Sequence, residues 1–170
     1  MEPGLDRLNS LAANEAEAEF GKCCGSTNWA RRMAAECPFV SSNQLVTIAD
    51  RIWWSLEPED WLEAFASHPK IGENKETRAT AAEVQNWAAQ EQAGAENAAE
   101  ETVRSLAKLN REYEEKFGYI YIVCATGKSS EEMLAILRQR LPNDAETELR
   151  IAAREQSRIT KLRLGKLLDQ

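Results

Sequence analysis

The sequence predicts an all-α fold, a single compact multi-helix domain that covers residues 1–170 and contains roughly seven or eight helices. Three observations predict it. Residues of high helix propensity fill most positions: alanine, leucine, glutamate, glutamine, arginine and lysine. Apolar residues recur at steps of three and four through most of the chain. Capping residues or prolines precede several of these stretches.

Four helices are expected in the first part of the chain: from Asn14 to about Cys23, from Asn28 to Glu36, from Ser41 or Ser42 onward, and from Pro58 towards Ser67. Pro38 ends the second of them, because the residue before a proline is pushed out of the helical region. A serine side chain caps the third. Pro58 suits the first position of the fourth, since a helix needs no N–H there.

Four more helices are expected after a break at residues 68–72: over 78–94, over 96–117, from the Ser129 cap to Leu141, and from the Asn143 cap to about Leu168. The second of these carries Val103, Leu106 and Tyr113 on one apolar stripe and is stopped by a glycine. The last two begin with a capping box, in which a glutamate follows the capping residue by three positions.

Residues 119–125 do not look helical. They are β-branched and aromatic, and Gly118 and Gly127 enclose them. A lone strand would have no partner in this chain. We therefore expect a short extended connector, at about residues 119–125, that is threaded through a helical core. Its buried backbone groups need hydrogen-bond partners, and a ligand could supply some of them.

Composition and charge exclude several classes of protein. The net charge of −7 argues against nucleic acid or an anionic membrane as partner. No apolar run approaches the ~20 residues that a bilayer span needs, and the acidic N-terminus does not resemble a signal peptide. The four cysteines have no zinc-binding spacing, and the chain has one histidine. The sequence therefore predicts a cytoplasmic protein with free, buried or half-buried thiols, no metal and no membrane.

Three places could carry chemistry. His68, the only histidine, follows a helix end and could exchange a proton near neutral pH, although a lone histidine is usually an ordinary surface residue. Glu91 and Gln92 lie among small residues near a helix end, but such residues are mostly just exposed. Arg163 lies near the apolar stripe of the last helix, whose other cations should be solvated. Its planar fork of donors suits a carboxylate or a pair of carbonyls.

Several motifs occur in a fixed order: His68-Pro69-Lys70-Ile71-Gly72, Glu91-Gln92-Ala93-Gly94, Asn110-(x2)-Tyr113-Glu114-Glu115-Lys116-Phe117-Gly118-Tyr119, and Arg163-Leu164, with Pro38-Phe39 upstream. From about Phe20 to Leu168 the chain resembles 2-oxo-4-hydroxy-4-carboxy-5-ureidoimidazoline (OHCU) decarboxylase. The resemblance implies an all-α, cofactor-free enzyme that forms (S)-allantoin in the last step of urate degradation.

The resemblance also implies roles for individual residues. His68 resembles the catalytic acid, Glu91 its carboxylate partner, and Arg163 a substrate clamp. The substrate wall would consist of Pro69, the turn of Ala88, Ala89, Gln90 and Gln92, and the backbone of Tyr121, Ile122, Val123, Cys124 and Ala125. Ala88 departs from the serine usual in the family, so one hydroxyl contact is missing. The region of Cys23 and Cys24 also departs from the family pattern.

Two other functions fit the same sequence. A non-catalytic helical interaction domain would have the same alanine-rich helices and acidic surface, but no cleft joining His68, Glu91 and Arg163. A ureide-binding or hydrolytic relative would keep the fold and change the chemistry, since fold alone does not define function. In the decarboxylase reading the partner is a small ureidoimidazoline, and the family resemblance makes a homodimer plausible.

Overall fold

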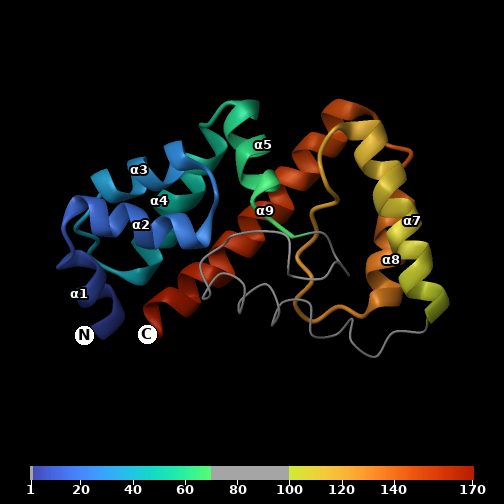
Figure 1. The fold of residues 1–170 in the computed structure, drawn as a ribbon. Coiled ribbons are helices and arrows are strands. Elements are labelled where there is room, and N and C mark those ends of the chain that lie inside the picture. The colour runs from blue at the N-terminus through green and yellow to red at the C-terminus, as the bar shows by residue number, and fades with distance from the viewer. Residues whose placement is uncertain (1, 70–99) are drawn as a thin grey trace. The chain divides into compact units, whose positions relative to one another are not determined.

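The structure is a computed structural model that describes residues 2–69 and 100–170, and over these residues it contains eight α-helices and no strand (Figure 1). The predicted all-α class is confirmed. The helix expected over 78–94 lies outside the described residues. The chain divides into two compact units, one of residues 1–64 and 157–170 (unit 1) and one of residues 65–156 (unit 2). One domain over residues 1–170 stays a prediction.

Unit 1 contains the N-terminal helices and the second half of the last one: α1 (Pro3–Asn9), α2 (Ala13–Cys23), α3 (Thr27–Ala35), α4 (Ser42–Trp54), most of α5 (Pro58–Ala66) and the end of α9 (Ala145–Leu168). Helix α1 was not expected, although Pro3 opens it. The cap of α4 is Ser41, whose Oγ accepts a hydrogen bond from the Gln44 backbone N–H at 3.1 Å. The four helices expected in this part of the chain are confirmed.

Aromatic side chains form the centre of unit 1. Trp29 of α3 is fully buried, and its indole N–H donates to the carbonyl of Ala49 at 3.1 Å. Phe20 of α2 meets the Trp29 ring edge-on, with ring centroids 6.0 Å apart. Helix α3 therefore packs against both α2 and α4, and the indole supplies the polar contact that a buried tryptophan needs.

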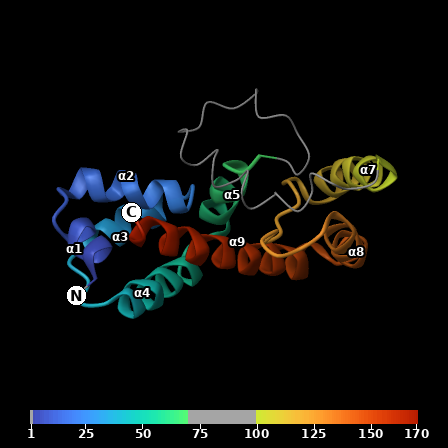
Figure 2. The same cartoon turned by 90° about the horizontal axis from the view of Figure 1, so that it is seen from below.

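Unit 2 contains the end of α5, helix α7 (Glu100–Phe117), helix α8 (Ser130–Arg140) and the first half of α9. Gly118 ends α7 with a φ of +82°, a conformation that favours glycine. Residues 120–125 are then extended and belong to no strand among the described residues, which confirms the expected connector. It carries the chain back along the helices, so α7 and α8 run side by side in the same direction (Figures 1 and 2).

The connector lies in the core of unit 2. The buried cluster draws on α7, the connector and α8: Leu106, Tyr113, Tyr121, Val123, Ala125, Met133, Leu134 and Leu137. Val103 was expected on this buried stripe and is 43% exposed, so that prediction was wrong. The cluster begins one turn further along α7, at Leu106, which leaves the first turn of the helix in solvent.

Side chains cap the last two helices. The Ser129 Oγ accepts from the Glu132 N–H at 3.1 Å, as predicted. The cap of α9 is Asp144 and not Asn143, because the Asp144 carboxylate accepts from the Thr147 N–H at 2.9 Å. Asn143 instead donates from Nδ2 to the Glu148 carboxylate at 3.1 Å. Both residues can cap a helix, and the side-chain hydrogen bond of Asn143 to Glu148, within the first turns of α9, leaves the cap to Asp144.

Two further predictions concern the thiols and the membrane. Cys23, Cys24 and Cys124 are buried, Cys37 is half-buried, and all four are free thiols, as expected. None of the helices within residues 2–69 and 100–170 is long and apolar enough to cross a membrane.

Candidate functional site

His68 lies in unit 2, in the turn that ends α5. Its backbone N–H donates to the Phe65 carbonyl at 3.2 Å, and only 7% of the residue is exposed. The imidazole Nε2 lies 2.6 Å from Oε1 of Gln156, which is fully buried in α9. The one histidine of the chain is therefore buried and hydrogen-bonded, and the alternative that it is an ordinary surface residue is excluded.

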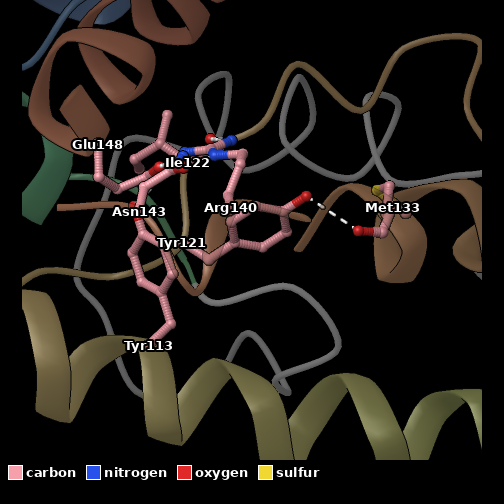
Figure 3. Close-up of polar contacts among 7 residues, drawn as sticks. All are labelled: Tyr113, Tyr121, Ile122, Met133, Arg140, Asn143 and Glu148. Carbon is pink, nitrogen blue, oxygen red and sulfur yellow. Dashed lines mark hydrogen bonds and ion pairs between the residues drawn. The ribbon is translucent and has the colours of Figure 1, made fainter. Parts of the chain in front are cut away.

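The connector is held by two cations of unit 2. The carbonyl of Ile122 accepts a hydrogen bond from Nη1 of Arg140 at 2.7 Å, and the carbonyl of Cys124 accepts one from Nζ of Lys128 at 2.7 Å. The Tyr121 hydroxyl donates to the Met133 carbonyl at 2.9 Å (Figure 3). Charged donors give the stronger class of hydrogen bond. The chain itself thus supplies partners for two connector carbonyls for which a ligand was considered.

A buried ion pair fixes the position of Arg140. Its Nε lies 2.7 Å from Oε1 of Glu148, and Nη2 lies 2.6 Å from the same oxygen. The Tyr113 hydroxyl donates to that oxygen at 2.6 Å, and Asn143 reaches the other carboxylate oxygen. Arg140 is 5% exposed and Glu148 is 0% exposed. Figure 3 shows the guanidinium between the carboxylate and the connector, so the ion pair orients the arginine that holds Ile122.

Burial shifts the ionisation of this network. Burial raises the pKa of the Tyr113 and Tyr121 hydroxyls above their ordinary range, and the charge of Arg140 opposes this only in part. Burial alone would lower the pKa of Arg140, but the hydrogen bond and negative charge of Glu148 raise it. The guanidinium also lies over the Tyr121 ring, 4.9 Å from its centroid. The tyrosines therefore stay neutral and the arginine stays charged at neutral pH.

Arg163 lies in unit 1 on α9 and is 3% exposed, as its place near the apolar stripe predicted. The neighbouring cations Arg158 and Lys161 are exposed. Near Arg163 lies the thiol of Cys24, whose pKa burial raises to about 11 against the lowering effects of the Ser26 backbone, Thr160 and the Arg163 charge. Arg163 is thus the inward cation of this part of the helix.

The structure describes some of the predicted site residues and not others. His68 and the five connector residues are buried in unit 2, Pro69 is half-buried beside His68, and Arg163 is buried in unit 1. The residues that lie outside the described part are Ala88, Ala89, Gln90, Glu91 and Gln92. The meeting of His68, Glu91 and Arg163 in one cavity stays a prediction.

Sequence reasoning missed Gln156, Arg140 and Glu148. The signal for two of them was present in the last helix, where Glu148, Ala152, Gln156, Ile159 and Arg163 follow one another at steps of three and four. A polar residue on such a stripe is either buried with a partner or misplaced. Arg163 was identified in this way, and the same argument applies to Glu148 and Gln156.

No group of three His, Cys, Asp or Glu side chains within residues 2–69 and 100–170 could hold a metal ion. Fold and site together define an all-helical protein whose single histidine is buried against a glutamine and whose core contains an extended segment clamped by an arginine. Residues 9–165 match the family model described as OHCU decarboxylase. The chain belongs to the OHCU decarboxylase family.

Similar proteins carry related names. A crystal structure described as OHCU decarboxylase in the presence of (S)-allantoin is 36% identical, with a TM-score of 0.77 and coverage of 89% of this chain and 98% of that one. The uric acid degradation bifunctional protein TTL of Arabidopsis thaliana is 35% identical over 94% of this chain and 49% of its own length. The OHCU decarboxylase of Haloferax volcanii is 26% identical over 95% of this chain and 94% of its own.

The bifunctional relatives are longer proteins. This chain spans about half the length of the Arabidopsis protein and about a third of a bifunctional protein from Bacillus. The likeness to these proteins therefore concerns one part of each of them.

Proposed function

We propose that the chain decarboxylates OHCU to (S)-allantoin without a cofactor, with His68 as the proton donor. The observation that carries the proposal is the family match over residues 9–165, joined to the burial of the single imidazole at 7% exposure. Burial matters because a proton donor to a carbanion must be shielded from competing water.

The chemistry needs little from the protein. Breaking the bond to the carboxylate releases CO₂ and leaves an electron pair on the ring carbon. The substrate's own C=N and carbonyl groups delocalise this charge, so no external electron sink is required. The protein must hold the carboxylate out of the conjugated plane and deliver one proton to one face. His68 delivers that proton, and the face it occupies sets the S configuration.

The remaining roles follow from the family resemblance. Glu91 holds the imidazole and a hydroxyl or ureido N–H of the substrate. Gln92 and Arg163 bind the ring and ureide oxygens, and the fork of the guanidinium suits two carbonyls. Pro69, the turn from Ala88 to Gln90 and the connector backbone wall the substrate. Alanine at 88 costs one hydroxyl contact, which a reaction that also proceeds unaided tolerates.

The test supplies freshly generated OHCU and follows circular dichroism, because allantoin formed by the enzyme is optically active. Wild type should accelerate the appearance of the signal. The His68→Asn variant should lose ~10²–10⁴-fold in kcat, the contribution typical of a general acid. Near-wild-type turnover by His68→Asn would remove His68 from this role, and wild type without any acceleration would leave a ureide-binding or interaction domain.

The role of Arg163 can be tested with a matched control substitution on the same helix. Arg163→Met should raise KM because the buried clamp is lost, whereas Arg154→Met, which changes an exposed arginine of α9, should leave both constants unchanged. Equal effects of the two substitutions would argue against a clamp.

The proposal also covers the oligomeric state of the chain and its location in the cell. The partner of the chain is its small-molecule substrate, and the family resemblance favours a cytoplasmic homodimer. Light scattering on the purified chain tests the dimer, since the monomer has a mass of 19.1 kDa.

A further inference from the structure

The hydrogen bond between His68 and Gln156 joins two side chains 88 positions apart in the sequence. Gln156 is fully buried in α9, and His68 sits in the turn after α5 at 7% exposure. An amide oxygen only accepts hydrogen bonds, so at 2.6 Å the imidazole Nε2 must carry the hydrogen. A buried amide that lost this partner would cost free energy, so the contact favours one ring orientation and one tautomer.

We infer that Gln156 is a positioning residue that keeps a proton on Nε2 of His68 and thereby assigns the catalytic proton to Nδ1. The inference rests on the proposed function for its catalytic part. It concerns a residue to which neither the sequence motifs nor the family resemblance gave a role.

The arrangement suits repeated proton transfer. When imidazolium gives its Nδ1 proton to the carbanion, the ring becomes the neutral Nε2–H tautomer, which is the form that Gln156 accepts from. A proton from water then returns to Nδ1 after product leaves. Nε2 donates to Oε1 before and after the transfer, so the ring need not turn over or exchange tautomers during the cycle. Other enzymes orient a catalytic imidazole by a hydrogen bond to its second nitrogen in the same way.

A neutral amide also differs from a carboxylate in this position. A carboxylate on Nε2 would stabilise the imidazolium and hold back its proton, because an opposite charge favours the charged form of its neighbour. Gln156 orients the ring at Nε2 without adding a second full negative charge to the one proposed for Glu91, whose contact with the imidazole then falls on Nδ1.

The single histidine makes the test direct. In the full chain labelled with ¹⁵N-histidine, every imidazole signal belongs to His68, and the nitrogen shifts distinguish the protonated from the bare ring nitrogen. In wild type at a pH where the ring is neutral, the proton should be on Nε2. A neutral ring protonated on Nδ1 would overturn the inference without any variant being made.

Two variants of Gln156 and one control extend the test. Gln156→Met keeps the length of the side chain and removes the acceptor, so the Nε2–H signature should be lost and kcat should fall by ~10²-fold, the cost of a misplaced catalytic group. Gln156→Glu restores an acceptor and should recover the Nε2–H form. Gln139→Met, at an exposed glutamine of α8, should change neither readout.

The outcomes separate this inference from the proposed function. An unchanged kcat in a folded Gln156→Met variant overturns the positioning role. A wild-type chain with the proton on Nε2 but no decarboxylation of OHCU refutes the proposed function and supports the placement of the proton by Gln156.

Discussion

Replacing Glu148 by glutamine tests how strongly the buried ion pair stabilises unit 2. The substitution keeps the volume of the side chain and removes its negative charge. Arg140, which is 5% exposed, then remains charged and buried without the carboxylate that balanced it. Removing one partner of a buried pair costs about 3–5 kcal/mol, because the remaining charge stays desolvated. For a chain of this size the loss corresponds to a fall in Tm of roughly 6–20 °C.

The aromatic residues allow unit 2 to be followed separately. The three tyrosines, Tyr113, Tyr119 and Tyr121, all belong to unit 2, and Tyr113 and Tyr121 contact the network itself. Four of the five tryptophans belong to unit 1: Trp29, Trp53, Trp54 and Trp61. Urea unfolding followed by the near-UV dichroism of tyrosine should therefore shift to lower urea in Glu148→Gln, and tryptophan fluorescence reports mainly on unit 1.

The double variant supplies the control. Adding Arg140→Met to Glu148→Gln removes the uncompensated charge, so part of the lost stability should return even though the Ile122 carbonyl loses its donor. A loss below ~1 kcal/mol in the single variant, or a double variant that falls by the sum of both single changes, would show that the pair is not coupled as the geometry requires.

Three further predictions concern separate features. A Cβ on Gly4 would collide with the carbonyl oxygen of Leu168, so Gly4→Ala should destabilise unit 1 by about 1–3 kcal/mol in urea unfolding followed by tryptophan fluorescence. Gly21→Ala, where a Cβ meets open space in α2, should instead stabilise it by ~0.5–1 kcal/mol. The pKa of Cys24 is about 11 when folded against 9.0 ordinarily. Its thiol thus contributes stability that is fully present below pH 9 and lost as pH rises to 11. The free energy of unfolding should fall by ~2–3 kcal/mol over this range in wild type, and Cys24→Ala should abolish that fall. Asp144→Ala removes the cap of α9 and should lower the free energy of unfolding by ~1 kcal/mol, read by far-UV dichroism; an unchanged value would exclude Asp144 as the cap.

Helix boundaries could be predicted where local chemistry sets them. Ser41, Gly118 and Ser129 act through groups a few residues away, so their roles can be read from the sequence. Helix α1 was missed because its seven residues are too few to display a period. Asp144 was missed because Asn143 beside it caps helices equally well, and the sequence does not show that the Asn143 side chain bonds to Glu148, five residues further on.

The candidate site divides in the same way. The burial of Arg163 followed from the stripe of α9, which is a local pattern. The partner of His68 could not be predicted, because Gln156 reaches it only through the fold. The Arg140 clamp on Ile122 is likewise a contact between two segments 18 positions apart, and neither segment's own pattern indicates that it meets the other. The family resemblance identified candidate residues that touch substrate, and the structure adds the residues that hold two of them in place.

Helix α9 contributes to both cores, and this governs when they can form during synthesis. Glu148 completes the network of unit 2, and the Leu167 carbonyl of the same helix accepts from Arg7 in unit 1. The parts of both units that are made before residue 145 therefore leave the ribosome without their closing segment. Unit 2 can be completed once residue 156 has emerged, whereas unit 1 also waits for residues 157–170. Until each half of α9 has emerged, the apolar surface that it covers stays open to chaperones.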